Sequence, residues 1–210
     1  MSQGITTDTL RRGIERISAM LEASQEELNT ADGRLGDGDI GISMVNGLRG
    51  IRDELDQFPD DVGMALLQCA QAFSRTGGSS FGTLLATGLM GAAKETRGRL
   101  SVPWSEVPQL LQVAIDRMAS RGRSQLGDKT VLDALDAARQ AVDGLDQPDV
   151  MLVAANEAVA AALDRFRSLP CRQGRARIFG ERSIGLDDPG MLVIRRMLEG
   201  LADRSLTSID

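Results

Sequence analysis

The chain has no histidine and no tyrosine among its 210 residues, and it contains one tryptophan and two cysteines. Without histidine there is no Ser–His or Cys–His nucleophile pair, no imidazole ligand for a metal ion and no phosphohistidine. Aromatic side chains are scarce and the net charge is −6, whereas nucleic-acid binding requires a basic surface and stacking rings. The sequence therefore predicts an acidic protein that does not bind nucleic acid.

Long apolar stretches are also absent, since none approaches the roughly 18 residues that a membrane span needs. The first eight residues contain no basic region followed by an apolar run, which is the pattern of a signal peptide. Cys69 and Cys171 form no CxxC pair, and Cys69 falls in an apolar helical pattern typical of a buried thiol. We therefore expect no membrane association and a reducing, cytoplasmic location.

Hydrophobic residues recur at three- and four-residue intervals along most of the chain, as they do in amphipathic helices. The pattern predicts eight helices, within residues 10–28, 45–55, 62–73, 84–93, 107–118, 131–142, 150–163 and 191–201. No stretch alternates long enough to form a strand, and only residues 176–179 suit an extended conformation. We predict one all-α domain over residues 1–210, an up-and-down bundle or closed barrel of about eight antiparallel helices.

The segment 29–41 carries three carboxylates, Asp32, Asp37 and Asp39, among four glycines. Carboxylates this close repel one another unless a cation lies between them. A hard divalent ion with oxygen ligands, such as Mg²⁺, suits a chain without histidine whose cysteines lie elsewhere. An EF-hand is excluded, because position 12 counted from Asp37 is Leu48 and not Glu. The alternative is an Asx–Gly turn in which Asp39 caps the next helix.

A helix is expected to begin directly after these carboxylates. Its first backbone N–H groups, those of Ile40, Gly41, Ile42 and Ser43, are then expected to be free donors at the positive end of the helix dipole. Such a helix start favours phosphate binding. The segment therefore predicts a metal site and a phosphate site side by side.

Residues 76–83 read TGGSSFGT and allow two interpretations. The segment is either a flexible connection in which Ser79 or Ser80 caps the following helix, or a phosphate site. In the second case the glycines permit close approach of the backbone, and the serine hydroxyl groups donate to phosphate oxygens. This segment and the helix start at residues 40–43 together favour phosphate binding more than either does alone.

Residues 122–130, GRSQLGDKT, nearly match a P-loop, but Asp128 is inserted between Gly127 and Lys129 and no strand precedes the motif. We therefore reject a P-loop. Either Asp128 or Thr130 caps the helix that follows, or the connection beginning at Gly122 frames the base or ribose of a nucleotide.

The longest non-helical stretch, residues 170–189, is rich in Gly and Arg and is expected to be ordered. Its charged residues form a surface ion-pair set, or Arg175 binds phosphate as a planar fork. The set consists of Arg175, Arg177, Glu181 and Arg182. The stretch ends in Asp188, Pro189 and Gly190, which indicate a helix start with proline at its first position.

Four motifs occur in order across residues 29–190: GDGD-x-G, GGSS, GDKT-x-LDAL and GRA-x-x-x-GERSIG-x-x-DPG. Together they resemble the nucleotide-binding L subunit of dihydroxyacetone kinases. The resemblance implies a barrel of eight antiparallel helices with the nucleotide, ADP or ATP, at one end. It also implies two Mg²⁺ ions held by Asp32, Asp37 and Asp39. The implied nucleotide contacts are Ile40, Gly41, Ile42, Ser43, Ser79, Ser80, Gly122, Val131, Arg175, Asp188, Pro189 and Gly190.

The resemblance further implies a partner, a separate K subunit that holds the ketose covalently on its own histidine. Three features depart from the family: Ile40 and Leu186 stand where histidine or a similar polar residue is usual, and the loop at residues 77–83 is about three residues shorter. These changes concern the substrate and the partner face more than metal and nucleotide binding. A phosphocarrier of the phosphotransferase system is a further expected partner if ADP is recharged in place.

The leading hypothesis is phosphoryl transfer from a Mg²⁺-bound nucleotide to a terminal hydroxyl group of a small ketose. No general base is found in this chain, and the family supplies it from the K subunit. The alternative is a nucleotide-binding regulatory module of the same fold without kinase turnover. A third hypothesis is a helical enzyme that acts on a diphosphate without a partner.

Overall fold

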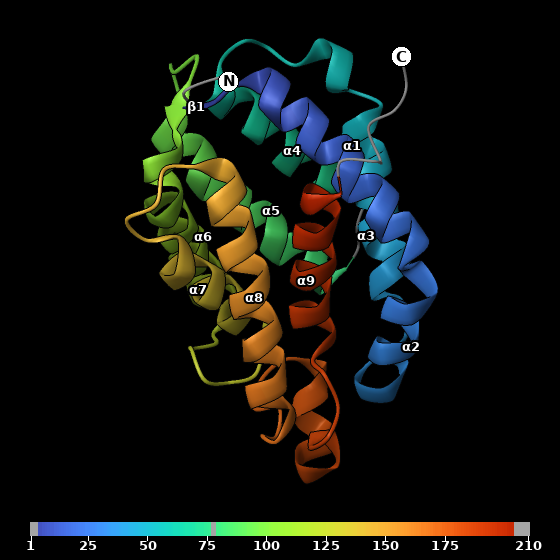
Figure 1. The fold of residues 1–210 in the computed structure, drawn as a ribbon. Helices are drawn as coiled ribbons and strands as arrows, with labels where there is room; N and C mark the ends of the chain where they lie inside the picture. Colours follow the sequence, from blue (N-terminus) through green and yellow to red (C-terminus); the bar gives the residue numbers. More distant parts are fainter. Residues whose placement is uncertain (1–3, 77–78, 204–210) are drawn as a thin grey trace.

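The computed structural model describes residues 4–76 and 79–203, which form an elongated assembly of helices (Figure 1). The described residues form nine α-helices: α1 (Thr7–Ala23), α2 (Gln25–Leu35), α3 (Ile40–Arg52), α4 (Val62–Thr76), α5 (Ser80–Thr96), α6 (Val107–Gly122), α7 (Val131–Val142), α8 (Pro148–Arg167) and α9 (Pro189–Ala202). Three 3₁₀ helices and two short strands complete them: η1 (Leu55–Gln57), η2 (Trp104–Glu106), η3 (Arg175–Ser183), β1 (Gly4–Ile5) and β2 (Val102–Pro103).

The helical contacts follow the chain order. Each helix from α3 to α9 contacts the next one, and α1 contacts both α3 and α9, while α7 also contacts α9 directly. One hydrophobic core receives buried side chains from every one of these α-helices. The predicted all-α class is confirmed, whereas the closed barrel and the single domain remain predictions.

The first predicted helix, residues 10–28, is divided into α1 and α2 at Ser24. The Ser24 N–H still bonds to the Met20 carbonyl at 3.0 Å, so the chain bends while the helical hydrogen bonds continue. No glycine or proline marks the bend, and the periodicity therefore predicted one helix. α2 then extends to Leu35 because Leu28 and Leu35, seven residues apart on one face, are both buried.

Two further expectations were wrong. Residues 176–179 are not extended but lie in η3, within the connection between α8 and α9 (residues 168–188), which we call the η3 segment. Within it, the Arg177 and Ile184 N–H groups donate in turns to the carbonyls of Gly174 and Glu181, which replaces pairing with a strand. The β1–β2 pair was not expected either; it joins Gly4 to Pro103 and Ile5 to Val102 in antiparallel register.

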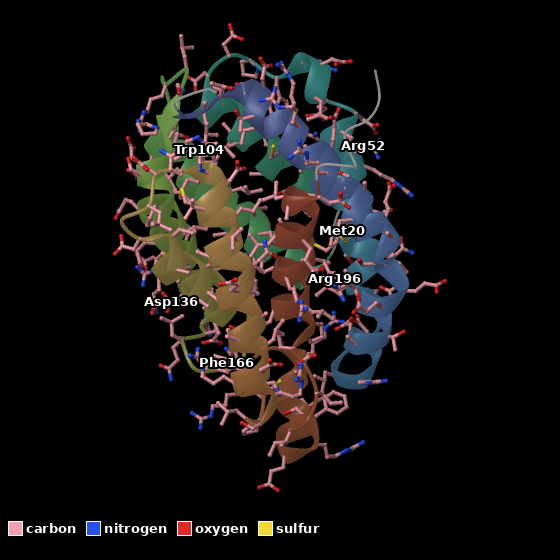
Figure 2. All side chains as sticks on the ribbon, viewed as in Figure 1. Met20, Arg52, Trp104, Asp136, Phe166 and Arg196 are labelled. Atoms are coloured by element: carbon pink, nitrogen blue, oxygen red, sulfur yellow. The ribbon has the colours of Figure 1, made fainter. Side chains whose placement is uncertain are left out.

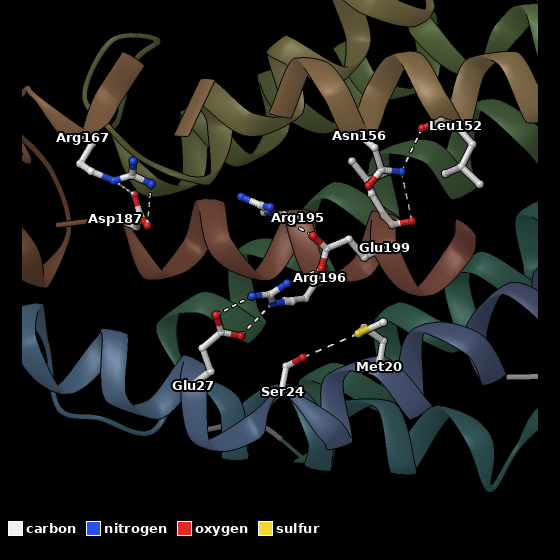
Figure 3. Close-up of polar contacts among 11 residues, drawn as sticks. Met20, Ser24, Glu27, Leu152, Asn156, Arg167, Asp187, Arg195, Arg196 and Glu199 are labelled. Atoms are coloured by element: carbon white, nitrogen blue, oxygen red, sulfur yellow. Dashed lines mark hydrogen bonds and ion pairs between the residues drawn. The ribbon is translucent and has the colours of Figure 1, made fainter. Parts of the chain in front are cut away.

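An ion pair joins α2 to α9 (Figure 3). The Arg196 guanidinium group on α9 donates to both carboxylate oxygens of Glu27 on α2, with Nε–Oε2 at 2.8 Å, and it also pairs with Glu199. A bidentate arginine–carboxylate pair of this kind fixes the relative orientation of the two side chains as well as their distance. The carboxyl-terminal half of α2, which carries Asp32, is thereby oriented relative to the start of α9.

The η3 segment lies at one end of the molecule, and the β1–β2 pair and Trp104 lie at the other end (Figures 1 and 2). The single tryptophan therefore reports on the fold and lies away from the site described below. Among the described residues, every helix is too short or too polar to cross a lipid bilayer.

Candidate functional site

A cavity of about 480 Å³ opens where α2 ends and α3, α5 and α9 begin, beside the η3 segment and the α6–α7 connection. Most of the site residues predicted from the sequence line it: Asp32, Asp37, Asp39, Ile40, Ser43, Ser79, Ser80, Gly122, Val131, Arg175, Asp188, Pro189 and Gly190. Segments as far apart in the sequence as Asp32 and Gly190 thus contribute to one surface. Gly41 and Ile42, also predicted, do not line the cavity.

The three carboxylates of the acidic turn, residues 32–39, converge at the cavity. One oxygen from each of Asp32, Asp37 and Asp39 can be chosen so that all three atoms lie within 4.8 Å of one another. Asp37 and Asp39 are exposed and Asp32 is half-buried. Asp32 lies on α2 and not in a loop, so a helix and the turn after it bring the three groups together.

The backbone donors expected to be free at the start of α3 are already satisfied, which corrects the sequence-based interpretation. Asp32 Oδ2 accepts from the N–H groups of Gly38 (2.9 Å), Asp39 (3.0 Å) and Ile40 (3.3 Å). Asn29 Oδ1 on α2 accepts from Gly41 (2.9 Å) and Ile42 (3.2 Å). The Ser43 N–H donates to the Asp39 carbonyl at 2.9 Å as an ordinary helical bond.

Gly41 explains why α2 approaches α3 closely enough for these bonds. A Cβ at this position would lie 2.4 Å from the Gln25 carbonyl oxygen and 2.8 Å from Asn29 Oδ1. Glycine therefore belongs to the contact between the two helices and not to a ligand surface. Ile42 is 45% exposed and also lies outside the cavity.

The Asp39 side chain does not cap α3, because it accepts no N–H from the helix. Among the described residues its carboxylate has no ion-pair partner, whereas Asp37 pairs with the Arg175 guanidinium group of the η3 segment. The other charged residues of that segment do not form the surface ion-pair set considered above; Arg182 instead stacks on Phe179, 5.8 Å from the ring centre. Arg175 is thus placed beside the acidic turn.

The cluster fits a divalent metal ion with oxygen ligands. All three side chains offer hard carboxylate oxygens, and neither cysteine takes part, since Cys69 and Cys171 are both buried free thiols. Asp32 uses one oxygen for the backbone, which leaves Oδ1 as a ligand. Exposed faces on Asp37 and Asp39 leave room for water and for the oxygens of a bound anion.

The start of α5 supplies donors on another wall of the cavity. Ser79 caps the helix, with its Oγ accepting from the Gly82 N–H at 3.2 Å, which confirms the predicted cap. The phosphate site stays a prediction, and Gly77 and Gly78 lie outside the described residues. The N–H groups of Ser80 and Phe81 have no acceptor among the described residues, and both residues line the cavity. The helix start therefore retains the donors that α3 lacks.

The α6–α7 connection, residues 123–130, closes the cavity on a further side. Thr130 caps α7 in a capping box: its hydroxyl oxygen accepts from Leu132 N–H, while Asp133 Oδ2 accepts from the Thr130 N–H at 2.8 Å. Asp133 Oδ1 also accepts from Gly127 N–H at 2.6 Å. Burial raises the pKa of Asp133 even though these bonds favour its charged form.

Asp188 and Pro189 begin α9 as predicted, with Asp188 Oδ1 accepting from the Met191 N–H at 2.8 Å. Asp188 is half-buried and keeps contact with solvent through the cavity. Burial raises its pKa to about 7, while the Met191 bond and the Lys129 ammonium group act in the opposite direction. This carboxyl group therefore changes charge near neutral pH.

Sequence reasoning missed the apolar wall of the cavity, to which Leu84, Met118 and Leu132 contribute. Met118 and Leu132 are buried, and in the sequence they read as core positions of amphipathic helices. It also missed Gln173, whose amide group donates to the carbonyls of Gly122 (3.1 Å) and Arg123 (2.7 Å). The wall suits a flat, weakly polar group such as a nucleotide base.

Comparison with known proteins agrees with this arrangement. Residues 34–203 match the family model of the DAK2 domain. The chain is 30% identical over 194 residues to the "PEP-dependent dihydroxyacetone kinase, ADP-binding subunit DhaL" of Escherichia coli, covering 90% of this chain and 92% of that protein. It is also 30% identical over 206 residues to the "L-erythrulose 1-kinase" of Mycolicibacterium smegmatis, covering 92% of this chain but 36% of that one.

Solved structures give the same fold. The native dihydroxyacetone kinase of C. freundii superposes with a TM-score of 0.72 at 26% identity, over 92% of this chain and 34% of that chain. The same kinase in complex with AMP-PNP and Mg²⁺ gives a TM-score of 0.73 at 21% identity, over 95% of this chain. The present chain thus spans about a third of those structures, 34% in both cases.

Proposed function

The chain belongs to the DAK2 domain family, and from this premise we propose that it is the nucleotide-binding, phosphoryl-transferring subunit of a dihydroxyacetone-type kinase. The observation that carries the proposal is the convergence of three carboxylates at a cavity that also holds the start of α5 and an apolar wall. The similarity to an ADP-binding subunit over 92% of its length supports the same assignment.

In this proposal Asp32, Asp37 and Asp39 would hold Mg²⁺, and the carboxylates of Asp37 and Asp39 are exposed to solvent. When bound, Mg²⁺ neutralises phosphate charge and orients the phosphate oxygens. Ser80 and Phe81 donate their N–H groups to phosphate at the positive end of α5. Arg175 offsets further negative charge, and the apolar wall receives the base. We propose two ions, a number that metal titration measures.

The acceptor is proposed to be a small ketose held by a separate K subunit. This chain lacks histidine, so both the anchoring of the ketose and its deprotonation are assigned to the partner. One relative at 30% identity is named an L-erythrulose kinase, which makes four-carbon ketoses reasonable acceptors beside dihydroxyacetone. The named relatives also include PEP-dependent kinases, so a phosphocarrier protein that recharges bound ADP is a second proposed partner.

Calorimetry with ADP, with and without MgCl₂, tests the nucleotide site. We expect binding that weakens at least about tenfold when EDTA removes the metal. Equal affinity in both conditions would contradict the metal-dependent site. An assay with a K subunit, dihydroxyacetone, four- and five-carbon ketoses, and either ATP or a phosphocarrier system then tests transfer. Turnover with ATP alone indicates exchange of nucleotide, and turnover only with the phosphocarrier indicates recharging of bound ADP.

The alternative is a nucleotide-binding regulator without turnover, which the departure at Ile40 favours because this residue lines the cavity where the family usually has histidine. Metal-dependent ADP binding without ketose phosphorylation in any of these combinations would support the regulator. Turnover of a phosphate ester by the isolated chain would instead support an enzyme that needs no partner.

A further inference from the structure

The η3 segment folds over one buried side chain, Lys129, from the α6–α7 connection. Lys129 is 1% exposed. Its ammonium group donates to the Leu169 carbonyl at 2.8 Å and to the Ser183 carbonyl at 2.9 Å. Leu169 lies at the start of the segment and Ser183 at the end of η3, so one cation joins both ends of the part that passes beside the cavity.

The choice of lysine is informative in this chain, which has 22 arginines and two lysines, Lys94 and Lys129. Lys94 is exposed on α5. At Lys129 two carbonyl oxygens converge on one nitrogen, an arrangement that a compact ammonium satisfies and that a planar guanidinium group does not. The Lys129 backbone has a φ of 62°, which is unfavourable for a residue with a Cβ. The position therefore requires this side chain despite its backbone cost.

Burial of an ammonium group is unfavourable unless its hydrogen bonds and charge are satisfied. The two carbonyl bonds satisfy the donors, and the nearby carboxyl groups of Asp187 and Asp188 offset the charge, while desolvation and Arg167 lower the pKa of Lys129. Without the ammonium group, both carbonyl oxygens lose their donor, and the half-buried carboxyl group of Asp188 loses a favourable neighbour. The segment is then expected to loosen.

Ser183 transmits this constraint into η3. Its hydroxyl oxygen accepts from the Cys171 N–H at 2.7 Å, and the hydroxyl group donates to the Gly180 carbonyl at 2.6 Å. Ser183 is fully buried. Cys171 and Gly180 flank the stretch that includes Gly174 and Arg175, both of which line the cavity. The hydrogen bonds of Lys129 and Ser183 thus hold both ends of the stretch that carries Arg175, which pairs with Asp37.

Other contacts secure single points of the η3 segment. The guanidinium group of Arg167 donates to Asp187, with Nε–Oδ1 at 2.9 Å (Figure 3). Gln173 donates to the end of α6, as described above, and the Arg172 N–H donates to the Asp128 carbonyl at 3.0 Å. Lys129, from outside the segment, hydrogen-bonds to it at Leu169 and at Ser183 and so joins its two ends directly.

We propose that Lys129 is a positioning residue of the nucleotide site: by joining Leu169 to Ser183 it holds the η3 segment so that Arg175 faces the acidic turn. The proposal goes beyond the proposed function and relies on it for the ligand, ADP with Mg²⁺. Lys129 itself contacts no part of that ligand in this account.

Substitution of each lysine by methionine provides a matched test, because methionine is of similar length and donates no hydrogen bond. We expect Lys129→Met to raise hydrogen exchange in residues 168–188 at least about tenfold, with little change in α4 and α5. ADP–Mg²⁺ affinity should fall about tenfold. Lys94→Met should change neither quantity. Unaltered exchange and affinity in a folded Lys129→Met protein would overturn the proposal.

A double-mutant cycle separates positioning from general loss of structure. If Lys129 acts through Arg175, then Lys129→Met should weaken ADP–Mg²⁺ binding in the native background but not in an Arg175→Ala background. Additive losses would mean that Lys129 does not act through Arg175 and would overturn the proposal. Far-ultraviolet circular dichroism confirms that each variant retains its helices.

Amine labelling of the unmodified protein keeps the test independent of any variant. An N-hydroxysuccinimide ester should acylate Lys94 rapidly and Lys129 at least about a hundredfold more slowly, as read by peptide mass spectrometry. ADP with Mg²⁺ should slow the labelling of Lys129 further and leave Lys94 unchanged. Equal labelling of both lysines would refute the role of Lys129 in holding the η3 segment, even if ADP binds. If Lys129 is protected but the protein does not bind ADP, the proposed function is refuted, whereas the attachment of the η3 segment by Lys129 is not.

Discussion

The acidic turn and the surroundings of Lys129 both crowd charged groups, and they satisfy those groups differently. In the acidic turn, Asp37 and Asp39 are exposed, and neither carboxylate accepts a hydrogen bond from a backbone N–H group of the described residues. Around Lys129, the buried charges of Asp133 and of Lys129 itself are bonded to backbone groups at distances of 2.6 to 2.9 Å. Charge left incompletely satisfied at a surface is available to a ligand, whereas charge satisfied by the backbone fixes the chain.

The Asp32 carboxylate does both: it bonds to the backbone, and it is part of the cluster available to a ligand. One of its oxygens accepts three N–H groups and so determines the shape of the turn, and its carboxylate has an oxygen within 4.8 Å of oxygens of Asp37 and Asp39. The comparison therefore predicts that substitutions at exposed members of the cluster abolish ligand binding with little effect on folding. Substitutions at backbone-bonded members should affect folding first.

The largest expected effect comes from Asp37→Asn, which removes one negative charge and a metal ligand without changing shape. We expect ADP affinity in the presence of Mg²⁺ to fall at least about a hundredfold, because a metal shared by three carboxylates loses one. Calorimetry measures the affinity, and circular dichroism should show unchanged helicity. Asp143→Asn, at an exposed carboxylate after α7, is the matched control and should bind ADP normally. Undiminished affinity in Asp37→Asn would exclude the metal site.

The next largest effect is expected from Gly41→Ala, which tests the contact between α2 and α3. The added methyl group would lie 2.4 Å from the Gln25 carbonyl oxygen. α2 and α3 must move apart to avoid this clash, which should destabilise the fold by about 2 to 3 kcal/mol. Urea unfolding followed by Trp104 fluorescence gives the free energy of unfolding. Gly41→Ala should also weaken Mg²⁺ binding, because the turn carrying Asp37 and Asp39 is held between these helices.

Gly33→Ala serves as the control for that experiment. Gly33 is also helical, but its nearest neighbour would lie 3.7 Å from the new methyl group, an ordinary contact. Alanine should therefore stabilise α2 by about 0.5 to 1 kcal/mol through helix propensity. If both variants are equally stable, the close approach at Gly41 does not determine the packing of α2.

The same residues show which parts of the fold and of the site could be predicted from the sequence alone. Periodicity located the helices because burial of one face is recorded in the spacing of apolar residues. It did not locate the bend at Ser24, where hydrogen bonds continue and no glycine or proline intervenes. Consequently Asn29 and Asp32 were assigned to a loop, and their role as acceptors for the start of α3 was missed.

The site residues were predictable where chemistry is repeated in one short segment, as for the three carboxylates. They were not predictable where a residue acts across the fold. Lys129 appeared as part of a rejected P-loop, and its partners Leu169 and Ser183 lie 40 and 54 residues away. Its rarity, as one of two lysines beside 22 arginines, was the available signal.

A pH-dependent effect is expected at Asp188, which lies between the two regions. Its pKa in the folded protein is raised to about 7 from 3.8, so the folded state binds its proton more tightly than the unfolded state does. The stability that this provides is present below about pH 4 and is lost progressively as the pH rises to about 7. From pH 5 to pH 8 the contribution should fall by on the order of 2 kcal/mol.

Asp188→Asn isolates that contribution, because the amide oxygen can still accept from the Met191 N–H and cap α9. Urea unfolding at pH 5 and pH 8 should therefore show a smaller loss of stability in the variant than in the native protein. The same pH dependence in both proteins would mean that Asp188 does not titrate in this range.

The smallest effect, and the one that most sharpens the comparison, is expected from Arg175→Ala. Arg175 pairs with Asp37, and its side chain is 57% exposed, so the pair contributes at most about 1 kcal/mol. Because the guanidinium group competes with a cation for the same carboxylate, its removal should strengthen binding of Mg²⁺ alone by about three- to fivefold. It should weaken binding of ADP–Mg²⁺, because a positive charge near the phosphates is lost. Titrations of metal alone and of ADP at saturating metal measure the two effects. Changes of the same sign would show that Arg175 affects the shape of the site and not its balance of charge.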